Sequence, residues 1–316
     1  MEVSIATSGR VASSATDREH FAALDAIRGL AALSVVVHHV SWLYPAGSLN
    51  YVRNGYLMVD VFFVLSGFVI FYSYFWRLYP LHFTFLIVAL LIEVIKFALA
   101  SHYEMNSNHP AFLENNMSAF VKNLFLVQAL HTSSQSTFNV PAWSISTEFC
   151  AYLLFAAVAF VSRTRVALLT VSGLFCATSF LFLVALGPLS ATLTYDFGIV
   201  RCLVGFFSGV LLYALYDRIR ATSFVHRNPQ LFGAAGILSL LAVIAFLASK
   251  DHPGYSDLCI CPLSAAVILP AALAPGTSAV RFLYFRPLQW LGMVSYSVYM
   301  VHFAVLWFVK GFLRFV

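Results

Sequence analysis

The sequence predicts an all-α, polytopic transmembrane helix bundle with about nine to ten spans. Of its 316 residues, 61% are hydrophobic and only 10% are charged, a composition from which a water-soluble surface cannot be built. Apolar runs of about 20 residues recur along the chain, and a run of that length crosses a hydrocarbon core of about 30 Å. We expect one integral membrane domain over residues 21–316, preceded by a disordered cytoplasmic head over residues 1–20.

Nine apolar runs are long enough to span a membrane, and a tenth run is ambiguous. The nine lie near 22–44, 56–75, 79–101, 142–162, 165–187, 195–217, 229–249, 257–275 and 288–313. The shorter run at 117–130 is expected to be re-entrant or interfacial, because a full crossing would move the arginine-rich loops to the opposite side.

The distribution of basic residues predicts the orientation. If the segment 117–130 does not cross the membrane, eleven of the eighteen lysines and arginines lie on the same side as the amino terminus. The amino terminus is therefore expected in the cytoplasm and the carboxyl terminus outside. The head has no apolar region of its own, so we expect no cleavable signal peptide. The expected location is the cytoplasmic membrane.

The net charge of +5 is explained by this asymmetry and gives no reason to expect a nucleic acid partner. The five cysteines lie in or beside apolar runs and are expected to be small buried side chains. Their spacing is too sparse for a zinc site, and no metal is expected.

The first span carries ionisable side chains where a membrane span should have none. The eleven steps from Arg28 to His39 make about three helical turns, which places both on one face and about 16 Å apart along the axis. Asp25 shares this face and can pair with Arg28, whereas His38 points about 100° away and is expected to be structural or to assist the site. The pattern predicts a site that takes an anionic reagent from one side and uses it inside. The alternatives are an arginine that only anchors the helix and a core histidine bonded to a carbonyl group.

Two further carboxylates lie in other spans. Asp60, in the second span, is expected to meet a partner such as His39, unless it faces water at the rim. Glu148 lies five residues after Trp143 in the fourth span, where an isolated carboxylate is hard to explain structurally. Trp143 can also be an aromatic residue of the membrane interface.

The last span carries a polar stripe. Ser295, Tyr299 and His302 follow at steps of four and three and are expected to face the bundle interior. Arg77 precedes the third span on the side of Arg28, and two arginines there can grip phosphate groups, although a cytoplasmic loop carries arginine in any case. Two pairs are expected to be structural ion pairs: Glu93 with Lys96, and Asp196 with Arg201.

Five segments in order, LDAIRGLAALSVVVHH, VDVFFVLSGFVI, WRLYP, WSISTEF and SYSVYMVH, resemble the acyltransferase-3 family of integral membrane acyltransferases. Bacterial members of this family O-acylate cell-surface glycans. The resemblance covers residues 22 to about 310, and the family's motif of an arginine and a histidine separated by ten residues falls on Arg28 and His39.

The resemblance implies transfer of an acyl group, commonly acetyl, from cytoplasmic acyl-coenzyme A to a hydroxyl of a saccharide, a lipid-linked glycan or a related acceptor at the membrane. Acyl-coenzyme A is then a co-substrate, and no tightly bound cofactor is expected. The resemblance also implies site residues. They are His39 as the catalytic residue, Arg28 and Arg77 as contacts of the coenzyme or of the structure, and Asp60, Trp143 and Glu148 as positions that line the site. Together with the patterns above, this leads us to expect His39, Asp60 and Glu148 to carry catalysis, Arg28 and Arg77 to bind the coenzyme, and Asp25, Trp143, Ser144, Tyr299 and His302 to line the site.

We expect neutral His39 to act as a general base on the acceptor hydroxyl. In a variant of this mechanism, His39 takes the acyl group itself and passes it on. A different function, a transporter or flippase, would use His39, Asp60 and Glu148 as a proton relay, but the sequence has no evident inverted repeat. A third alternative is a catalytically silent family member. It is favoured by the short stretch between Tyr74 and Arg77, where members of the family usually carry a longer cytoplasmic loop with further arginines.

Overall fold

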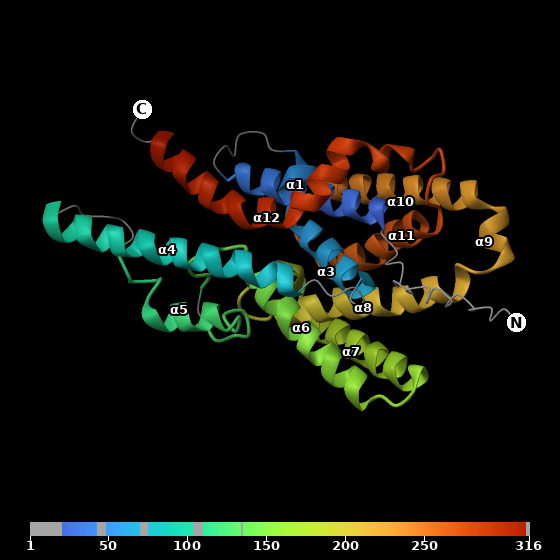
Figure 1. The fold of residues 1–316 in the computed structure, drawn as a ribbon, viewed down its shortest axis with the longest axis horizontal. Helices are drawn as coiled ribbons and strands as arrows, with labels where there is room; N and C mark the ends of the chain where they lie inside the picture. The colour runs from blue at the N-terminus through green and yellow to red at the C-terminus, as the bar shows by residue number, and fades with distance from the viewer. Residues whose placement is uncertain (1–20, 43–48, 70–74, 104–109, 134, 314–316) are drawn as a thin grey trace, which may run out of the picture.

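The structure is a computed structural model that describes residues 21–42, 49–69, 75–103, 110–133 and 135–313, with the side chains of 75–78, 103 and 311–313 also outside the description. The described residues form one helical bundle with no strand (Figure 1). Nine of their helical segments are long and apolar enough to cross a membrane. The fold class predicted from the sequence is confirmed. The head expected at 1–20 lies outside the described residues.

Each spanning helical segment overlaps one of the predicted apolar runs, because a chain in lipid must satisfy its backbone hydrogen bonds within each segment. The spans are α1 (Ala22–Val40), α2 (Asn50–Arg53) continued through η1 (Asn54–Leu57) into α3 (Met58–Val69), α4 (Phe75–Tyr103), α6 (Ala142–Val161), α7 (Arg165–Leu186), α8 (Gly198–Ile219), α10 (Pro229–Ser249), α11 (Ile260–Leu273) and α12 (Arg286–Leu313). Short connecting helices are η2 (Ser190–Thr192), α9 (Ser223–Arg227), η3 (Tyr255–Cys259) and η4 (Arg281–Tyr284).

The ambiguous run at 117–130 does not form a spanning helix. Its only regular element is α5 (Met117–Leu124), with eight residues, or about 12 Å of helix. The side chain of Asn116 caps its start by accepting a hydrogen bond from the backbone N–H of Ala119 at 3.0 Å. Because about 20 residues are needed to cross the hydrocarbon core, this segment fits the predicted re-entrant or interfacial assignment.

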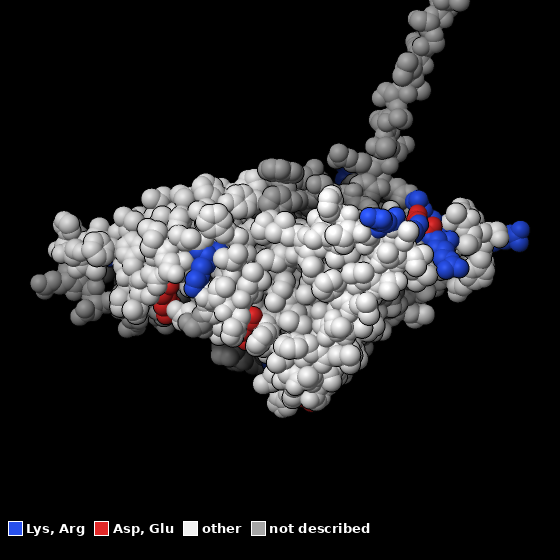
Figure 2. Space-filling model, turned by 90° about the horizontal axis from the view of Figure 1, so that it is seen from below, with Lys and Arg blue, Asp and Glu red and all other residues white. Residues whose placement is uncertain are grey.

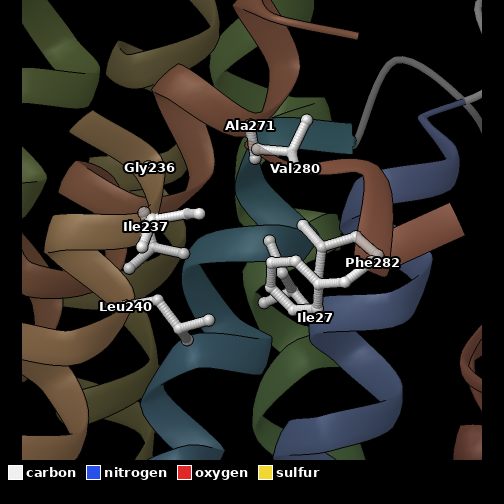
Figure 3. A pocket seen from close by; sticks show the side chains of 9 residues that line it. Ile27, Gly236, Ile237, Leu240, Ala271, Val280 and Phe282 are labelled. Carbon is white, nitrogen blue, oxygen red and sulfur yellow. The ribbon is translucent and has the colours of Figure 1, made fainter. Parts of the chain in front are cut away.

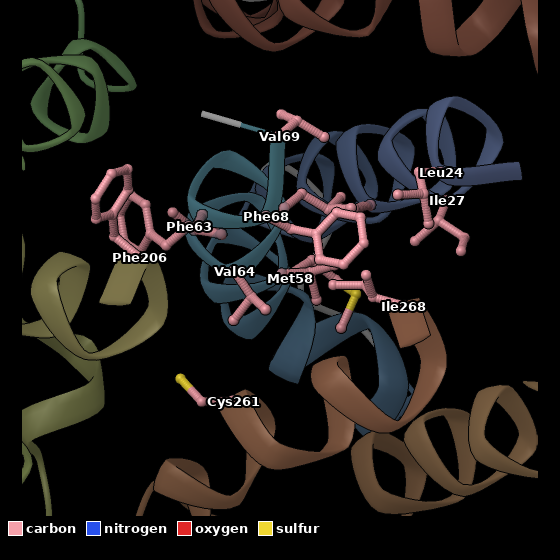
Figure 4. Close-up of a cluster of buried hydrophobic side chains, with 14 of the residues drawn as sticks. Leu24, Ile27, Met58, Phe63, Val64, Phe68, Val69, Phe206, Cys261 and Ile268 are labelled. Carbon is pink, nitrogen blue, oxygen red and sulfur yellow. The ribbon is translucent and has the colours of Figure 1, made fainter. Parts of the chain in front are cut away.

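The core is built around α3, which crosses α8 at close range. A Cβ atom added to Gly67 would collide with the backbone oxygen of Phe206, and one added to Gly209 would collide with that of Val64. Small residues let two helix backbones approach in this way. Large apolar side chains fill the space around the crossing, including Phe63 (Figure 4).

The first and last spans, α1 and α12, pack along each other in parallel. The side-chain amide of Gln289 donates to the backbone oxygen of Ala22 at 2.8 Å. Further along, a Cβ on Gly29 would lie 2.8 Å from the backbone nitrogen of Gly292. This packing determines how the carboxyl-terminal halves of α1 and α12 face each other.

The outer surface is mostly apolar. Figure 2 shows a broad uncharged face, with most of the visible charged side chains gathered at one end of the molecule. Among the ion pairs outside the core, Asp217 joins Arg165 at 2.8 Å and Arg220 at 3.2 Å. An apolar belt with charges beyond it is what a multi-pass membrane protein requires.

Candidate active site

His39 lies in the last turn of α1 and is half-buried. Its Nδ1 atom lies 2.9 Å from the backbone oxygen of Val35, one turn earlier, and 3.2 Å from Nε2 of His302. The rings of Trp42 and Phe303 have centroids 4.7 Å and 5.6 Å from that of His39. The imidazole is therefore held between α1 and α12, with aromatic groups beside it.

The polar stripe of α12 faces the bundle interior, as predicted. Ser295, Tyr299 and His302 are all buried. Nδ1 of His302 lies 2.6 Å from the backbone oxygen of Tyr299, and the Tyr299 hydroxyl lies 2.9 Å from Oγ of Ser144 on α6. These contacts connect α6 to α12 and α12 to His39 on α1.

Arg28 and Asp25 form the ion pair that their spacing predicted. Nη1 of Arg28 lies 2.7 Å from Oδ1 of Asp25, and the two side chains are 17% and 14% exposed. They lie on the same helix as His39, in the half of α1 where it packs against Gly292. The guanidinium and the imidazole thus occupy opposite halves of one span.

Glu148 has a partner that the sequence did not predict. Its Oε1 accepts a hydrogen bond from Oγ of Ser66 on α3 at 2.7 Å, and its side chain is half-buried. Glu148 follows Ser144 by four residues, so both lie on one side of α6. The only sequence signal for Ser66 is that it is a hydroxyl within an otherwise apolar run.

Asp60 does not meet His39, and this prediction was wrong. Nε and Nη2 of Arg201 on α8 donate to Oδ1 and Oδ2 of Asp60 at 2.8 Å and 2.6 Å. The guanidinium carbon lies 5.5 Å from the ring centroid of Trp143, which is buried. A guanidinium matches both oxygens of a carboxylate and carries a permanent charge of its own that needs compensation, so it is a better partner than an imidazole. Trp143 is accordingly a buried residue that packs against this ion pair, and not an aromatic residue of the membrane interface.

The pair of Asp196 with Arg201 was also predicted wrongly. Oδ1 of Asp196 instead accepts from the backbone N–H of Thr194 at 3.1 Å. The expected pair of Glu93 and Lys96 is present, at 2.9 Å.

Three further expectations concern His38, Arg77 and metal binding. His38 is buried and its Nδ1 lies 3.1 Å from the backbone oxygen of Val52, which fits a structural residue. Arg77 is in the first turn of α4, but its side chain lies outside the described residues. Within the described part of the chain, no three His, Cys, Asp or Glu side chains are grouped so as to hold a metal ion.

A small pocket lies between α1, α10, α11 and η4 (Figure 3). Its lining includes Ile27, Leu240 and Phe282, and every lining residue is apolar or glycine. Such a pocket cannot orient a thioester or a hydroxyl group through side-chain hydrogen bonds. It is not lined by Arg28 or His39 and is separate from the candidate site.

The fold and the site define a class of protein: a multi-pass helical membrane protein with a buried pair of histidines between its first and last spans. Residues 21–316 match the acyltransferase domain of the acyltransferase-3 family, and the chain belongs to that family. Membership implies an acyl donor and an acceptor.

Three named proteins are similar to this chain. The peptidoglycan O-acetyltransferase OatA of Listeria monocytogenes is 22% identical over 92% of this chain and 50% of its own length. The acyltransferase MdmB of Streptomyces mycarofaciens is 32% identical over 42% of this chain and 37% of its own length. Protein 2 in the picA locus of Rhizobium radiobacter is 45% identical over 19% of this chain and 30% of its own length. The chain therefore spans at most half the length of these relatives, and no solved structure matches it.

Proposed function

We propose that this chain is an O-acyltransferase that moves an acyl group, acetyl in the simplest case, from acyl-coenzyme A to a hydroxyl of a cell-surface saccharide or related acceptor. The observation that carries the proposal is the contact between His39 and His302 inside the bundle. An imidazole with one nitrogen held by an acceptor and the other available is a suitable base for a hydroxyl group. Family membership supports acyl transfer, and the similarity to a protein named as a peptidoglycan O-acetyltransferase supports a glycan acceptor.

In the proposed reaction, Nε2 of His39 takes the proton of the acceptor hydroxyl while the hydroxyl oxygen attacks the thioester carbonyl carbon. A C–O bond forms and the C–S bond breaks. The proton then passes from His39 to the leaving thiolate, so the products are an ester and free coenzyme A. A positioned histidine base accelerates such a step typically by about 10²–10⁴-fold.

We assign the donor to the half of α1 that carries Arg28, with the amino terminus in the cytoplasm. Coenzyme A is polyanionic, and a guanidinium binds phosphate oxygens through two parallel hydrogen bonds. Arg77 is assigned to the same donor. Glu148 and Ser144 lie on one side of α6. We assign them to a depth in the membrane between Arg28 and His39, where they line the path of the thioester.

The test is release of free coenzyme A from acetyl-coenzyme A by the purified protein in lipid nanodiscs, with and without a glycan acceptor. His39→Ala is expected to lower acceptor-dependent release by about 10²-fold or more. The matched control is His226→Ala, because His226 is an exposed histidine of α9, and its rate should stay within about twofold of the parent. Full activity of His39→Ala at equal protein level contradicts the proposal.

The same assay separates the other readings of the sequence. A transporter or a silent family member releases no coenzyme A with any acceptor. The variant in which His39 carries the acyl group predicts a radiolabelled acyl-protein that is absent from His39→Ala. Mass spectrometry of surface glycans from deletion and complemented cells then identifies the acyl group and the acceptor together.

A further inference from the structure

The hydrogen bonds of His302 define where its protons lie. Nδ1 of His302 is 2.6 Å from the backbone oxygen of Tyr299, and a carbonyl oxygen can only accept. Nδ1 therefore carries the hydrogen. In a neutral imidazole the other nitrogen, Nε2, is then an acceptor. This acceptor is directed at Nδ1 of His39, 3.2 Å away.

The same argument applies to His39. Its Nδ1 faces two acceptors, the backbone oxygen of Val35 at 2.9 Å and Nε2 of His302 at 3.2 Å, so Nδ1–H is a shared donor. Nε2 of His39 is then unprotonated, and no described residue hydrogen-bonds to it. The contacts of the two histidines are thus satisfied by one arrangement of protons, with a hydrogen on Nδ1 of each ring. In this arrangement Nε2 of His39 has a free lone pair and can act as a base.

We infer that His302 is a positioning residue for His39: it accepts the Nδ1–H of His39, keeps Nε2 of His39 as the base, and stabilises the imidazolium formed when Nε2 takes a proton. This inference deepens the proposed acyl transfer and rests on it. When the ring becomes positive, its Nδ1–H becomes a stronger donor. The Val35 oxygen is the i−4 carbonyl of the helix and also serves the backbone, whereas Nε2 of His302 is an undivided acceptor.

His302 is itself held firmly enough for this role. It is buried, and the helix around it is tied to the start of α6 by two contacts. The Tyr299 hydroxyl meets Ser144 at 2.9 Å, and the side-chain amide of Asn139 donates to the backbone oxygen of Met300 at 3.0 Å. A positioning group must have its own orientation fixed in this way.

Two amide substitutions separate the positioning role from a packing role. In His302→Gln the side-chain carbonyl can reach the place of Nε2 and accept from His39. In His302→Asn the amide takes the place of Nδ1, where it can still donate to Tyr299 but cannot reach His39. We expect His302→Asn to lower kcat for coenzyme A release by roughly 10- to 100-fold with the donor KM unchanged, and His302→Gln to retain kcat within about fivefold. Equal losses in both variants, or a loss that appears only in KM, overturn the inference.

A second measurement does not depend on turnover. Diethyl pyrocarbonate acylates unprotonated imidazole nitrogens, and peptide mass spectrometry of the full-length protein in nanodiscs reports each histidine separately. In the parent protein, His39 should react several-fold faster than His302, whose two nitrogens are engaged. The His39 rate should fall in His302→Asn and persist in His302→Gln. Faster reaction at His302 than at His39 in the parent overturns the inference, whereas absence of coenzyme A release with this labelling order intact overturns only the proposed function.

Discussion

Asp60 and Arg201 place opposite charges where neither could remain alone. Both side chains are 3% exposed, and the guanidinium also donates to the backbone oxygens of Leu193 at 3.3 Å and Tyr56 at 3.1 Å. Two charged groups leave water at a cost of several kcal/mol each, which only good mutual geometry offsets. The pair therefore makes the seating of α3 against α8 specific.

Removing one partner is expected to be far more damaging than removing both. Asp60→Ala leaves Arg201 buried and uncompensated and should destabilise the bundle by about 3–5 kcal/mol. The double variant Asp60→Ala/Arg201→Met should recover part of this loss. Arg165→Ala breaks a surface pair in which the Arg165 side chain is 59% exposed and should cost about 0–1 kcal/mol. Unfolding in detergent, followed by tryptophan fluorescence, measures all three, and a single Asp60→Ala variant as stable as the parent contradicts this account.

The ion pairs also show how far a sequence predicts contacts between side chains. Asp25 with Arg28 could be predicted, because a spacing of three on a helix fixes proximity. Asp60 with Arg201 could not, because the two are 141 positions apart and no periodicity tells which spans are neighbours. The sequence indicated that each buried charge needs a partner, and only packing decided which one.

At the scale of the element, the site depends on one helix pair. α1 and α12 are parallel and touch at Gly29 and Gly292, ten residues before His39 and His302 on each helix. A Cβ on Gly292 would collide with the backbone oxygen of Asp25, so the helices cannot keep their separation with a larger residue there. The close contact at Gly29 and Gly292 thus sets the distance between the two imidazoles, although it lies ten residues earlier on each helix.

Gly292→Ala should therefore impair both folding and turnover. Overpacking of this kind typically costs about 1–3 kcal/mol, and we expect coenzyme A release to fall on the order of 10-fold as the His39–His302 contact lengthens. The matched control is Gly173→Ala in α7, where an added Cβ meets nothing within 4 Å and the better helix propensity of alanine applies. Melting temperature and turnover are measured for both. Unchanged turnover in Gly292→Ala would show that this crossing does not position the histidines.

The element boundaries were predictable where hydropathy alone decides them. The second span is the exception, since helix begins at Asn50 and not near 56. The added turns carry polar side chains that bond to the loop after α10. Asn50 bonds to Asp251 at 2.9 Å, and Asn54 donates to the backbone oxygen of Lys250 at 2.9 Å. An average of hydropathy along the sequence does not predict helical turns that are stabilised by tertiary hydrogen bonds.

At the scale of the whole molecule, the number of crossings fixes the relation between its two ends. The described part of the chain has nine candidate spans, and α5 is too short to add a tenth. The parallel α1 and α12 agree with this odd count. The loop between α6 and α7 and the loop between α10 and α11 then lie on opposite sides of the membrane. The excess of basic residues on the side of the amino terminus predicts that this side faces the cytoplasm.

Cysteine labelling can test that orientation directly. Cys259 is exposed in η3, whereas the other four cysteines lie within α6, α7, α8 and α11. A membrane-impermeant maleimide should therefore label Cys259 in spheroplasts, because the loop after α10 is expected outside. In a Cys259→Ser background, Arg163→Cys places a thiol at the exposed α6–α7 loop, which should react only in inside-out vesicles. The reverse labelling pattern would place the Arg28 half of α1 toward the outside, and cytoplasmic acyl-coenzyme A would then reach the His39 end first, against the assigned path of the donor.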